Sequence, residues 1–416
     1  MNNIQNLPVD DIAAEILPAL RAILSSNIAL IRNNKLINDF CKDEQHFTSI
    51  VNQKSITIDC PLFINNTQDA IQAIAEFQVN LEIYRKINNR LPQTIMLKDI
   101  GLVAAARDYR SACLTLDLFE NALCGKKNIN NATTFNTSDL MNVVENKIVV
   151  ITGGAQGFGG GIAEQMIVLN ANVVIADLNE TAGRQITDRL NDAERKNIAV
   201  FIKTDVSNPQ SVQNLIIETV KQFGGLDVFI SNAGILHAGG LDEMTPETFE
   251  LMTKINYTGY FLCVKYAAET LKLQAKYSSD CYFSDIIQIN SKSGLKGSNK
   301  NFAYSGGKFG GIGLTQSFAL ELMQYRIKVN SVCPGNFFDG PLWSDPEKGL
   351  FVQYLNAGKV PGAKTIADVK AFYENQVPAK RGCTVNDVMK AILYIIDQKY
   401  ETGQAIPVTG GQNMLN

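Results

Sequence analysis

The sequence predicts an α/β fold: a doubly wound, parallel sheet of seven strands with helices on both faces, preceded by a smaller, mostly helical domain. Short apolar runs alternate with helical patterns from Lys147 onward, and this alternation is typical of a parallel sheet. The first run leads into a glycine-rich turn, and the fifth ends near a serine followed by a Tyr-x-x-x-Lys spacing. The predicted strands are residues 147–152, 172–177, 199–205, 226–232, 285–291, 328–333 and 404–408.

Residues 1–124 are predicted to form the smaller α+β domain. Apolar residues share one helical face over residues 9–37 and again over residues 68–88, where Thr67 would be the N-cap. This region contains no constellation of catalytic side chains, so we expect it to be non-catalytic. The remaining predicted elements are a strand at 56–64, a strand and turn at 94–106, and a helix at 107–123.

Composition excludes several classes of protein. The 416 residues are 45% hydrophobic and 19% charged with a net charge of −3, and no basic run suggests a nucleic-acid partner. No apolar run approaches the roughly 18 residues of a membrane helix, and no signal peptide is recognisable, so we expect a cytoplasmic protein without a membrane partner. The cysteines are scattered without a Cys-x-x-Cys, and His46 and His237 are too few for a zinc site, so no metal is expected.

A polar segment rich in Asn and Thr, residues 125–146, is predicted to be the linker between the two domains. A short helix around residues 140–144 would close it.

The glycine-rich turn follows the first predicted strand and opens the next helix. Glycines permit a tight turn and let the backbone approach a pyrophosphate, while the helix N-terminus offers free N–H groups and a positive dipole end. Because the turn lies between a strand and a helix, it indicates a Rossmann dinucleotide site rather than a chance glycine cluster. The candidate cofactor residues here are Gly153, Gln156, Gly157, Phe158 and Gly159.

Asp177 ends the second predicted strand and is followed by Leu178. Its carboxylate can accept both ribose hydroxyls of an adenosine and would repel a 2′-phosphate. No Arg or Lys stands beside Asp177 or at Gln156 to offset that repulsion, so NAD is favoured over NADP. Asp177 could instead be the N-cap of the next helix, but Asn179 can fill that role equally well.

Ser291, Tyr304 and Lys308 form the candidate catalytic group. Tyr and Lys at i, i+4 lie on the same face of a helix, and an ammonium group favours ionisation of a neighbouring phenol. A serine hydroxyl at a strand end can hold a substrate oxygen beside that phenol, which gives a proton-transfer site for an alcohol–ketone pair. The alternative is a core tyrosine and a solvated lysine, which the upstream glycine turn makes less convincing.

Residues 147–416 resemble the short-chain dehydrogenase/reductase family. The matching residues, in chain order, are Thr152, Gly153, Gly157, Gly159, Asp177, Asp205, Asn232, Ala233, Gly234, Asn256, Ser291, Tyr304, Lys308, Pro334 and Gly335. The resemblance implies an NAD-dependent oxidoreductase that works as a homodimer or homotetramer, paired through the helices predicted around residues 246–273 and 304–325.

The resemblance also implies a role for each matching residue. Tyr304 would take the proton from the substrate hydroxyl, Lys308 would lower the Tyr304 pKa and bind the nicotinamide ribose, and Ser291 would fix the substrate oxygen. Asn256 would hold a water that relays the proton, although it could simply be a polar residue that bends a helix. The implied cofactor contacts are Asp205 and Val206 at the adenine, and Asn232, Ala233, Gly234, Pro334 and Gly335 along the cleft.

Four further stretches, residues 288–294, 308–317, 377–383 and 402–412, are similar to bacterial sorbitol-6-phosphate 2-dehydrogenases. They imply oxidation of sorbitol 6-phosphate to fructose 6-phosphate. A dehydrogenase of another polyol or sugar phosphate is one alternative. A binding or scaffold protein with a vestigial cofactor fold is another, which the intact Ser, Tyr and Lys disfavour.

A sugar-phosphate substrate requires cationic and polar groups beside the catalytic serine. The candidates are Lys292, Ser293 and Lys296 after Ser291, with Lys380 and Arg381 nearer the C-terminus. For any one of these cations, a solvated surface side chain is about as good an interpretation.

Residues 336–382 are predicted to form a lid over the substrate, with Trp343, Phe351, Tyr354 and Phe372. His237 would lie near its mouth or simply on the surface. The family usually follows Pro-Gly with a Thr that holds the nicotinamide carboxamide. Here the run is Asn336-Phe-Phe-Asp-Gly340, so Asn336 or backbone groups would have to replace it.

Residues 91–106, followed by a helix and a linker, look like the junction in fusions of a class II sugar-phosphate aldolase with a short-chain dehydrogenase. Such aldolases use a histidine-ligated zinc. Because this part of the chain has only His46, the resemblance implies a shortened, non-catalytic relic. Its place on the assembly is open: it could shield the active site or extend an interface.

Overall fold

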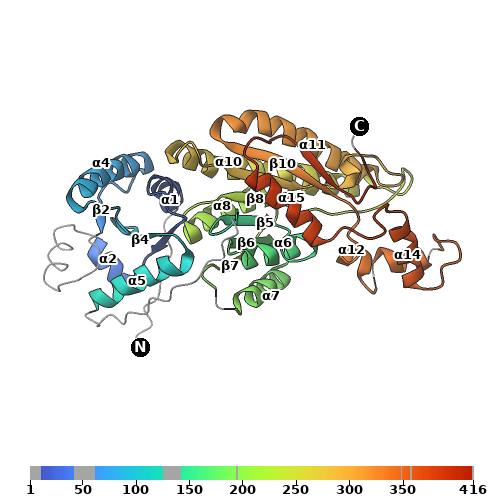
Figure 1. The fold of residues 1–416 in the computed structure, drawn as a ribbon, viewed down its shortest axis with the longest axis horizontal. Coiled ribbons are helices and arrows are strands. Elements are labelled where there is room, and N and C mark those ends of the chain that lie inside the picture. The colour runs from blue at the N-terminus through green and yellow to red at the C-terminus, as the bar shows by residue number, and fades with distance from the viewer. Residues whose placement is uncertain are drawn as a thin grey trace.

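The structure is a computed structural model that describes residues 11–41, 61–124, 142–193, 195–347, 349–356 and 358–414. The molecule is elongated, with the N-terminal region at one end, the large sheet in the middle and a group of short helices at the other end (Figure 1). The predictions for residues 125–141, for the first part of the strand at 56–64 and for His46 lie outside the described residues.

The large sheet confirms the predicted fold class. Its strand order is β11-β10-β9-β8-β5-β6-β7, and every pairing is parallel. The strands are β5 (Ile148–Thr152), β6 (Asn172–Asp177), β7 (Ala199–Lys203), β8 (Val228–Ser231), β9 (Ser284–Ile289), β10 (Ile327–Pro334) and β11 (Ala405–Val408).

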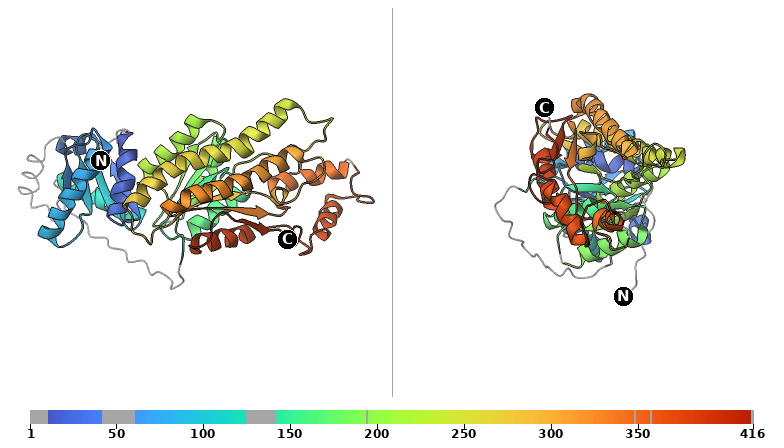
Figure 2. Two further views of the ribbon diagram at one scale, coloured as in Figure 1. Left: turned by 90° about the horizontal axis from the view of Figure 1, so that it is seen from above. Right: turned by 90° about the vertical axis from the view of Figure 1, so that its right-hand side faces the viewer.

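Helices cover both faces of this sheet because neighbouring residues of each strand point to opposite sides. Ile148 and Val150 of β5 enter one core, beneath α8, α10 and α11, while Val149 and Ile151 enter another, beneath α6, α7 and α15. The helices are α6 (Gly157–Val168), α7 (Glu180–Asn191), α8 (Pro209–Phe223), α9 (Pro246–Thr253), α10 (Gly259–Tyr277), α11 (Phe302–Leu322) and α15 (Val385–Asp397). Figure 2 shows α10 and α11, coloured yellow and orange, running side by side.

Three strands end before the polar residues that were predicted to close them. Asp205, Asn232 and Ser291 lie just beyond β7, β8 and β9, in the connections that follow. Their side chains bind nearby backbone groups instead: the Asp205 carboxylate, for example, accepts the Ser207 N–H at 2.9 Å. Such local contacts compete with strand pairing and start the turn.

The N-terminal region contains helices and a four-stranded sheet of order β1-β4-β3-β2, in which only β2 and β3 pair in parallel. Its strands are β1 (Ile28–Arg32), β2 (Leu62–Ile64), β3 (Thr94–Leu97) and β4 (Gly101–Ala106). Its helices are α1 (Ile12–Ile23), α2 (Lys35–Cys41), α4 (Ala70–Asn88) and α5 (Tyr109–Leu123).

Two predictions for this region are wrong in detail. The single amphipathic stretch over residues 9–37 is interrupted by the buried strand β1, because Ser25 adopts a positive φ of 52° and turns the chain. Asp69 rather than Thr67 is the N-cap of α4, accepting the Gln72 N–H at 2.9 Å. Thr67 instead donates its hydroxyl to the Lys98 carbonyl.

The N-terminal region packs at the amino ends of the large parallel strands. α1 contacts α8 and α10, and the two parts share one continuous hydrophobic core. Arg21 of α1 pairs at 2.5 Å with Asp227, which also accepts the Ile148 N–H at the start of β5. A Cβ on Gly224 would lie 2.6 Å from Ala29, so a glycine is needed where β1 approaches α8.

The short helix predicted around residues 140–144 does not form in its described part, where residues 143–146 make a turn into β5. The segment predicted to be the lid contains α12 (Pro341–Ser344), α13 (Leu350–Asn356) and α14 (Ile366–Asn375). It lies at the end of the molecule opposite the N-terminal region (Figures 1 and 2). No described helix is long and apolar enough to span a membrane.

Candidate active site

A cavity of about 760 Å³ opens at the carboxyl ends of the large parallel strands. Doubly wound sheets bind their ligands at this edge. The cavity runs from the glycine turn after β5, past the ends of β6 to β10, to the inner side of the lid. Its described lining contains no residue from the N-terminal region of the same chain.

The glycine turn has the geometry that its sequence predicts. Gly153 and Gly157 have φ values of 62° and 59°, in the left-handed region that favours glycine. A Cβ on Gly159 would lie 2.1 Å from the Gly153 carbonyl, so the turn can close only with glycine there. Gln156 makes no side-chain cap, which leaves first-turn N–H groups of α6 available to a ligand.

Asn232, after β8, holds this turn from the neighbouring strand. Its Nδ2 donates to the carbonyls of Thr152 and Gly153, each at 3.0 Å. The Thr152 hydroxyl in turn accepts the N–H groups of Asn232 and Ala233. Besides its predicted contact with the cofactor, Asn232 therefore stabilises the glycine turn.

Asp177 stands at the far end of the cleft. Its carboxylate accepts the Ala155 N–H at 3.0 Å and the Asn179 N–H at 2.9 Å, which fixes it beside the glycine turn. Asn179 is itself the N-cap of α7, as predicted, so Asp177 is not needed for that role.

Two nearby cations are already paired with a carboxylate. Lys203 and Arg184 both pair with Glu180, at 3.3 and 2.8 Å, and Leu178 next to Asp177 is 63% exposed. Asp205 and Val206 line the same end of the cavity, as predicted for adenine contacts.

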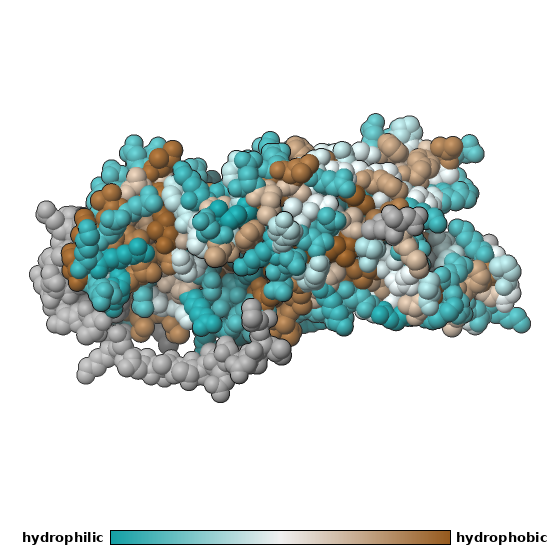
Figure 3. Space-filling view, turned by 45° about the horizontal axis from the view of Figure 1, so that its top comes forward, coloured by the Kyte–Doolittle hydropathy of each residue, from teal (hydrophilic) through white to brown (hydrophobic). Residues whose placement is uncertain are grey.

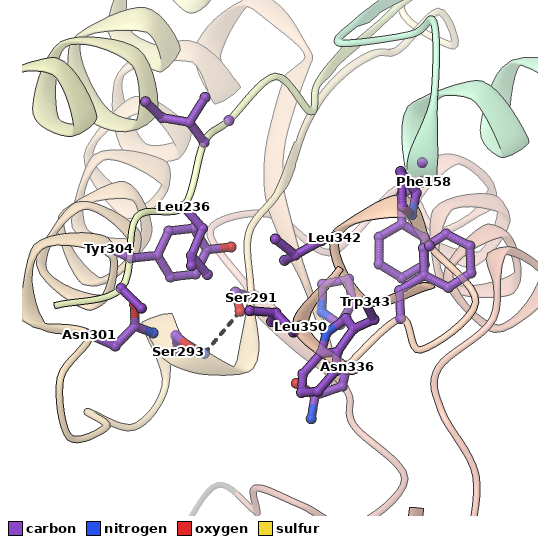
Figure 4. A pocket seen from close by; sticks show the side chains of 18 of the residues that line it. Phe158, Leu236, Ser291, Ser293, Asn301, Tyr304, Asn336, Leu342, Trp343 and Leu350 are labelled. Atoms are coloured by element: carbon purple, nitrogen blue, oxygen red, sulfur yellow. Dashed lines mark hydrogen bonds between the residues drawn. The ribbon is translucent and has the colours of Figure 1, made fainter. Parts of the chain in front are cut away.

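The catalytic group meets on the opposite wall. Figure 4 shows the Tyr304 ring entering the cavity above Ser291, whose hydroxyl accepts the Ser293 N–H at 3.1 Å. Lys308 lies one helical turn after Tyr304, with its Nζ 5.6 Å from the centre of that ring. The structure thus brings together the three side chains that the sequence predicted.

Close backbone packing positions this group. A Cβ on Gly294 would lie 2.2 Å from the Asn290 side chain, and one on Gly311 would lie 2.4 Å from Gln288. Without side chains at these glycines, α11 can approach the end of β9, and the Asn290 side chain donates to the Lys308 carbonyl. Tyr304 is held beside Ser291 by this contact.

Burial shifts the pKa values of Lys308 and Tyr304. The Lys308 side chain is nearly inaccessible and donates to the Ile289 carbonyl at 3.0 Å, and its burial lowers the Lys308 pKa to about 8. Burial also raises the pKa of Tyr304, against a smaller opposite effect of Ser291. Burial therefore keeps the Tyr304 pKa above its ordinary value in the protein without ligands, and the acidifying effect of Lys308 on this phenol stays a prediction.

Asn256 lies in a π-helical turn, Lys254–Thr258, between α9 and α10. Its side chain accepts the Ile235 N–H at 3.0 Å and donates to the Ile235 carbonyl at 2.9 Å. A Cβ on Gly234 would lie 2.7 Å from the Asn256 side chain, so the two pack tightly. Asn256 fixes the loop after β8 and does not line the cavity.

The segment predicted to be the lid, residues 336–382, borders one end of the cavity. Figure 4 shows Leu342, Trp343 and Leu350 facing Tyr304 and Ser291 across the cavity. Of the predicted lid aromatics, Trp343 and Tyr354 line the cavity, Phe351 is buried in the core of the lid, and Phe372 is 39% exposed. Phe158 and Phe337 stack at 4.4 Å between ring centres across the cofactor cleft.

Most of the predicted site residues line one cavity. The exceptions are Gly159, Asn256 and Lys308, which lie behind its wall, and Lys296, which is exposed and outside it. Lys292, Ser293 and Asn336 do line it, so the prediction for Lys296 is not supported by its position.

The two C-terminal cations are also outside the described lining. Lys380 donates to the Asn375 carbonyl, and Arg381 pairs with Asp387. His237 is exposed and outside it as well.

Sequence reasoning missed several polar residues of the substrate half. Apart from two adjacent residues before α11, they are far apart in the sequence, so no spacing pattern could have identified them. They are Lys300, Asn301, Lys359, Gln376 and Gln412. Among the described residues, no group of three His, Cys, Asp or Glu side chains could hold a metal ion.

Comparison with known proteins places this site in a family. The family model for short chain dehydrogenases matches residues 147–343. Sorbitol-6-phosphate 2-dehydrogenase of Escherichia coli (strain K12) is 35% identical over 273 residues, covering 65% of this chain and 100% of that protein. Trans-4-hydroxycyclohexanecarboxylate dehydrogenase of Sinomonas cyclohexanicum is 29% identical, covering 66% of this chain and 95% of that protein.

Solved structures agree with these matches. Sorbitol-6-phosphate 2-dehydrogenase from Erwinia amylovora superposes with a TM-score of 0.58 at 35% identity, covering 64% of this chain and 100% of that one. A 3-ketoacyl-(acyl-carrier-protein) reductase from Brucella melitensis, complexed with NADH, gives a TM-score of 0.55 at 21% identity over 65% of this chain, which shows the fold alone. Because this chain matches the whole length of a dehydrogenase at 35% identity, it belongs to the short-chain dehydrogenase/reductase family of oxidoreductases.

Proposed function

We propose that the protein oxidises sorbitol 6-phosphate to fructose 6-phosphate with NAD. The observation that carries the proposal is the arrangement of Tyr304, Ser291 and Lys308 at one end of a cavity whose other end is a glycine turn with Asp177. The choice of substrate is supported by the 35% identity to sorbitol-6-phosphate 2-dehydrogenases.

The residues present fit a nicotinamide dinucleotide. Gly153 and Gly157 leave room for a pyrophosphate at the start of α6, and the Asp177 carboxylate keeps lone pairs for the adenosine ribose. Bound NAD would supply the acceptor for the hydride that leaves the substrate carbon. Pro334, Gly335 and Asn336 line the same cavity, and Asn336 would replace the usual Thr in holding the nicotinamide carboxamide.

Ser291 and Tyr304 would act on the substrate hydroxyl. Ser291 holds the oxygen, and ionised Tyr304 accepts its proton while the hydride leaves the same carbon. The buried Lys308 ammonium stabilises the negative charge of the phenolate, and this effect grows when a ligand displaces water. Asn256 would contribute by fixing the loop at Ile235, which lines the cavity.

The direct test is reduction of NAD by sorbitol 6-phosphate, followed by the absorbance of reduced nicotinamide, with NADP and unphosphorylated sorbitol as comparisons. Preference for sorbitol 6-phosphate and NAD supports the proposal. Activity with another polyol phosphate alone would replace the substrate, and a wild-type protein inactive with the whole panel would favour a scaffold role.

We further propose that residues 1–124 are a non-catalytic domain and that the chain forms a homodimer or homotetramer. The first statement is supported by the position of the described N-terminal residues at the amino ends of the strands. The second is supported by Phe261 on α10 and by Phe309 and Leu320 on α11, which are 42%, 47% and 85% exposed. Light scattering on the purified chain, and loss of assembly in Leu320→Lys, test it.

A further inference from the structure

The cavity is divided by charge. Among its described lining residues, the carboxylates Asp177 and Asp205 stand in the dinucleotide half, whereas three lysines, Lys292, Lys300 and Lys359, stand in the substrate half. No carboxylate lines that substrate half within the part of the chain that the structure describes. Such a surface attracts an anion.

The three lysines differ in whether they already form an ion pair. Lys300 pairs with Glu243 at 2.9 Å on the rim, where both side chains are 58% exposed. Lys292 and Lys359 form no ion pair with any residue in the described ranges. The Lys359 Nζ instead lies 4.2 Å above the Tyr354 ring, which also lines the cavity.

The two unpaired lysines come from different parts of the fold. Lys292 follows the catalytic Ser291 in the turn after β9, and its burial lowers the Lys292 pKa. Lys359 belongs to the lid, in the connection between α13 and α14. Its charge helps to lower the Glu243 pKa, after the Gly240 N–H and Lys300, so the lid cation lies near the rim pair.

The balance of charge suits a phosphate monoester. Three ammonium groups against the single Glu243 carboxylate leave two positive charges around this end of the cavity. A phosphate monoester carries about two negative charges at neutral pH. It would remove the electrostatic cost of the half-buried, unpaired Lys292.

We propose that the phosphate group of the substrate binds between Lys292 and Lys359, and thereby connects the lid to the catalytic strand. The inference rests on the proposed function for the identity of the phosphorylated polyol. Lys359 and Lys292 are specificity-determining residues in this arrangement, because an unphosphorylated polyol gives neither lysine an anionic partner. Lys300, held by Glu243, contributes charge at the rim.

The activity test uses Lys292→Ala and Lys359→Ala, with Lys296→Ala as the matched control. Lys296 is exposed, lies four positions after Lys292 and is outside the cavity. We expect kcat/KM for sorbitol 6-phosphate to fall about 10- to 100-fold in each of the first two variants. Turnover of sorbitol should change less than threefold, and Lys296→Ala should match the wild type.

A binding test separates this inference from the proposed function. Trp343 is the sole tryptophan of the sequence and lines the cavity, so its fluorescence in full-length protein with NAD can report titration with inorganic phosphate. We expect the phosphate response to weaken at least tenfold in Lys292→Ala and Lys359→Ala and to persist in Lys296→Ala. This result without turnover of sorbitol 6-phosphate would keep the phosphate site and reject the proposed substrate. Equal phosphate binding in all four proteins would overturn the inference.

Discussion

Arg21→Met is predicted to destabilise the whole protein, although Arg21 is far from the active site. The Arg21 and Asp227 side chains are only 6% and 4% exposed, and their ion pair joins α1 to the start of β8. Asp227 also accepts the Tyr282 hydroxyl at 2.6 Å and the Ile148 N–H at 2.9 Å. Removing Arg21 leaves a buried carboxylate without its cation.

The expected loss of unfolding free energy follows from the burial of this ion pair. Breaking a buried ion pair on one side costs about 3–5 kcal/mol, whereas an exposed pair contributes about 0–1 kcal/mol. Lys221→Met is the matched control, because Lys221 also joins the N-terminal region to α8, but through Asp11, whose side chain is 77% exposed. Urea unfolding of both variants should show a large loss of stability only for Arg21→Met.

The effect should also depend on pH. Burial acts to raise the Asp227 pKa, but the charges of Arg21 and Lys147 and the Tyr282 hydrogen bond outweigh it and hold that pKa below its ordinary value. A carboxyl group with a lowered folded-state pKa contributes stability above about pH 4, and this contribution is lost as the pH falls further. The deficit of Arg21→Met should therefore be largest near neutral pH and shrink on acidification.

A loss below about 1 kcal/mol in Arg21→Met would refute this reasoning, because it would mean that the N-terminal region is held by apolar contacts alone. The double variant Arg21→Met with Asp227→Leu provides a second check. It removes both charges and should recover part of the lost stability. If the double variant is no more stable than Arg21→Met, the unpaired carboxylate is not the cause.

Three further predictions concern the active site. Tyr304→Phe should lower kcat about 100- to 10,000-fold with little change in NAD affinity measured by calorimetry; near-normal turnover would exclude Tyr304 as the base. Asp177→Ala should raise the KM for NAD about 10-fold or more and reduce the preference for NAD over NADP. An unchanged ratio of initial rates with NAD and NADP would contradict a contact between Asp177 and the ribose. Oxidation should speed up with rising pH, because burial raises the Tyr304 pKa and the ionised phenol is the base, whereas NAD affinity should fall above about pH 8 as Lys308 loses its charge. A rate that does not change with pH would oppose Tyr304 as the base. An NAD affinity that does not change with pH would oppose the role of Lys308.

Much of the dehydrogenase part could be predicted because its chemistry is local in the sequence. The glycine turn and the Tyr304–Lys308 spacing each occupy one short stretch, and strand alternation then brings their ends to the same edge of the sheet. The Asn179 N-cap could be foreseen for the same reason. Local patterns were enough wherever a single element carries the function.

Predictions from local sequence are weakest where tertiary contacts decide. Lys296 is as basic as Lys292, but only the turn after β9 determines which of the two faces the cavity. The acidifying effect of Lys308 on Tyr304 was expected from helical spacing, whereas the burial that opposes it depends on the whole site. Lys359 had no local partner in the sequence, because its relation to Lys292 exists only after the lid has folded over the sheet.

The position of the N-terminal region constrains what it can do. Parallel strands present their carboxyl ends to the cavity and their amino ends, at Ile148 and Asp227, to α1. The described part of the region therefore contacts the edge of the sheet opposite the cavity, and none of its residues lines that cavity.

Its outer surface is unusual, since α4 exposes Ile71, Val79, Ile83 and Ile87, and apolar patches are visible at that end of the molecule in Figure 3. The shared core with α8 and α10 makes removal of the region costly, because apolar surface on both helices would be exposed to water. If a chain without the N-terminal region lost activity, the first explanation would therefore be that it no longer folds correctly. Point variants such as Arg21→Met, assayed under conditions where they remain folded, are the sounder way to ask whether the region influences catalysis at all.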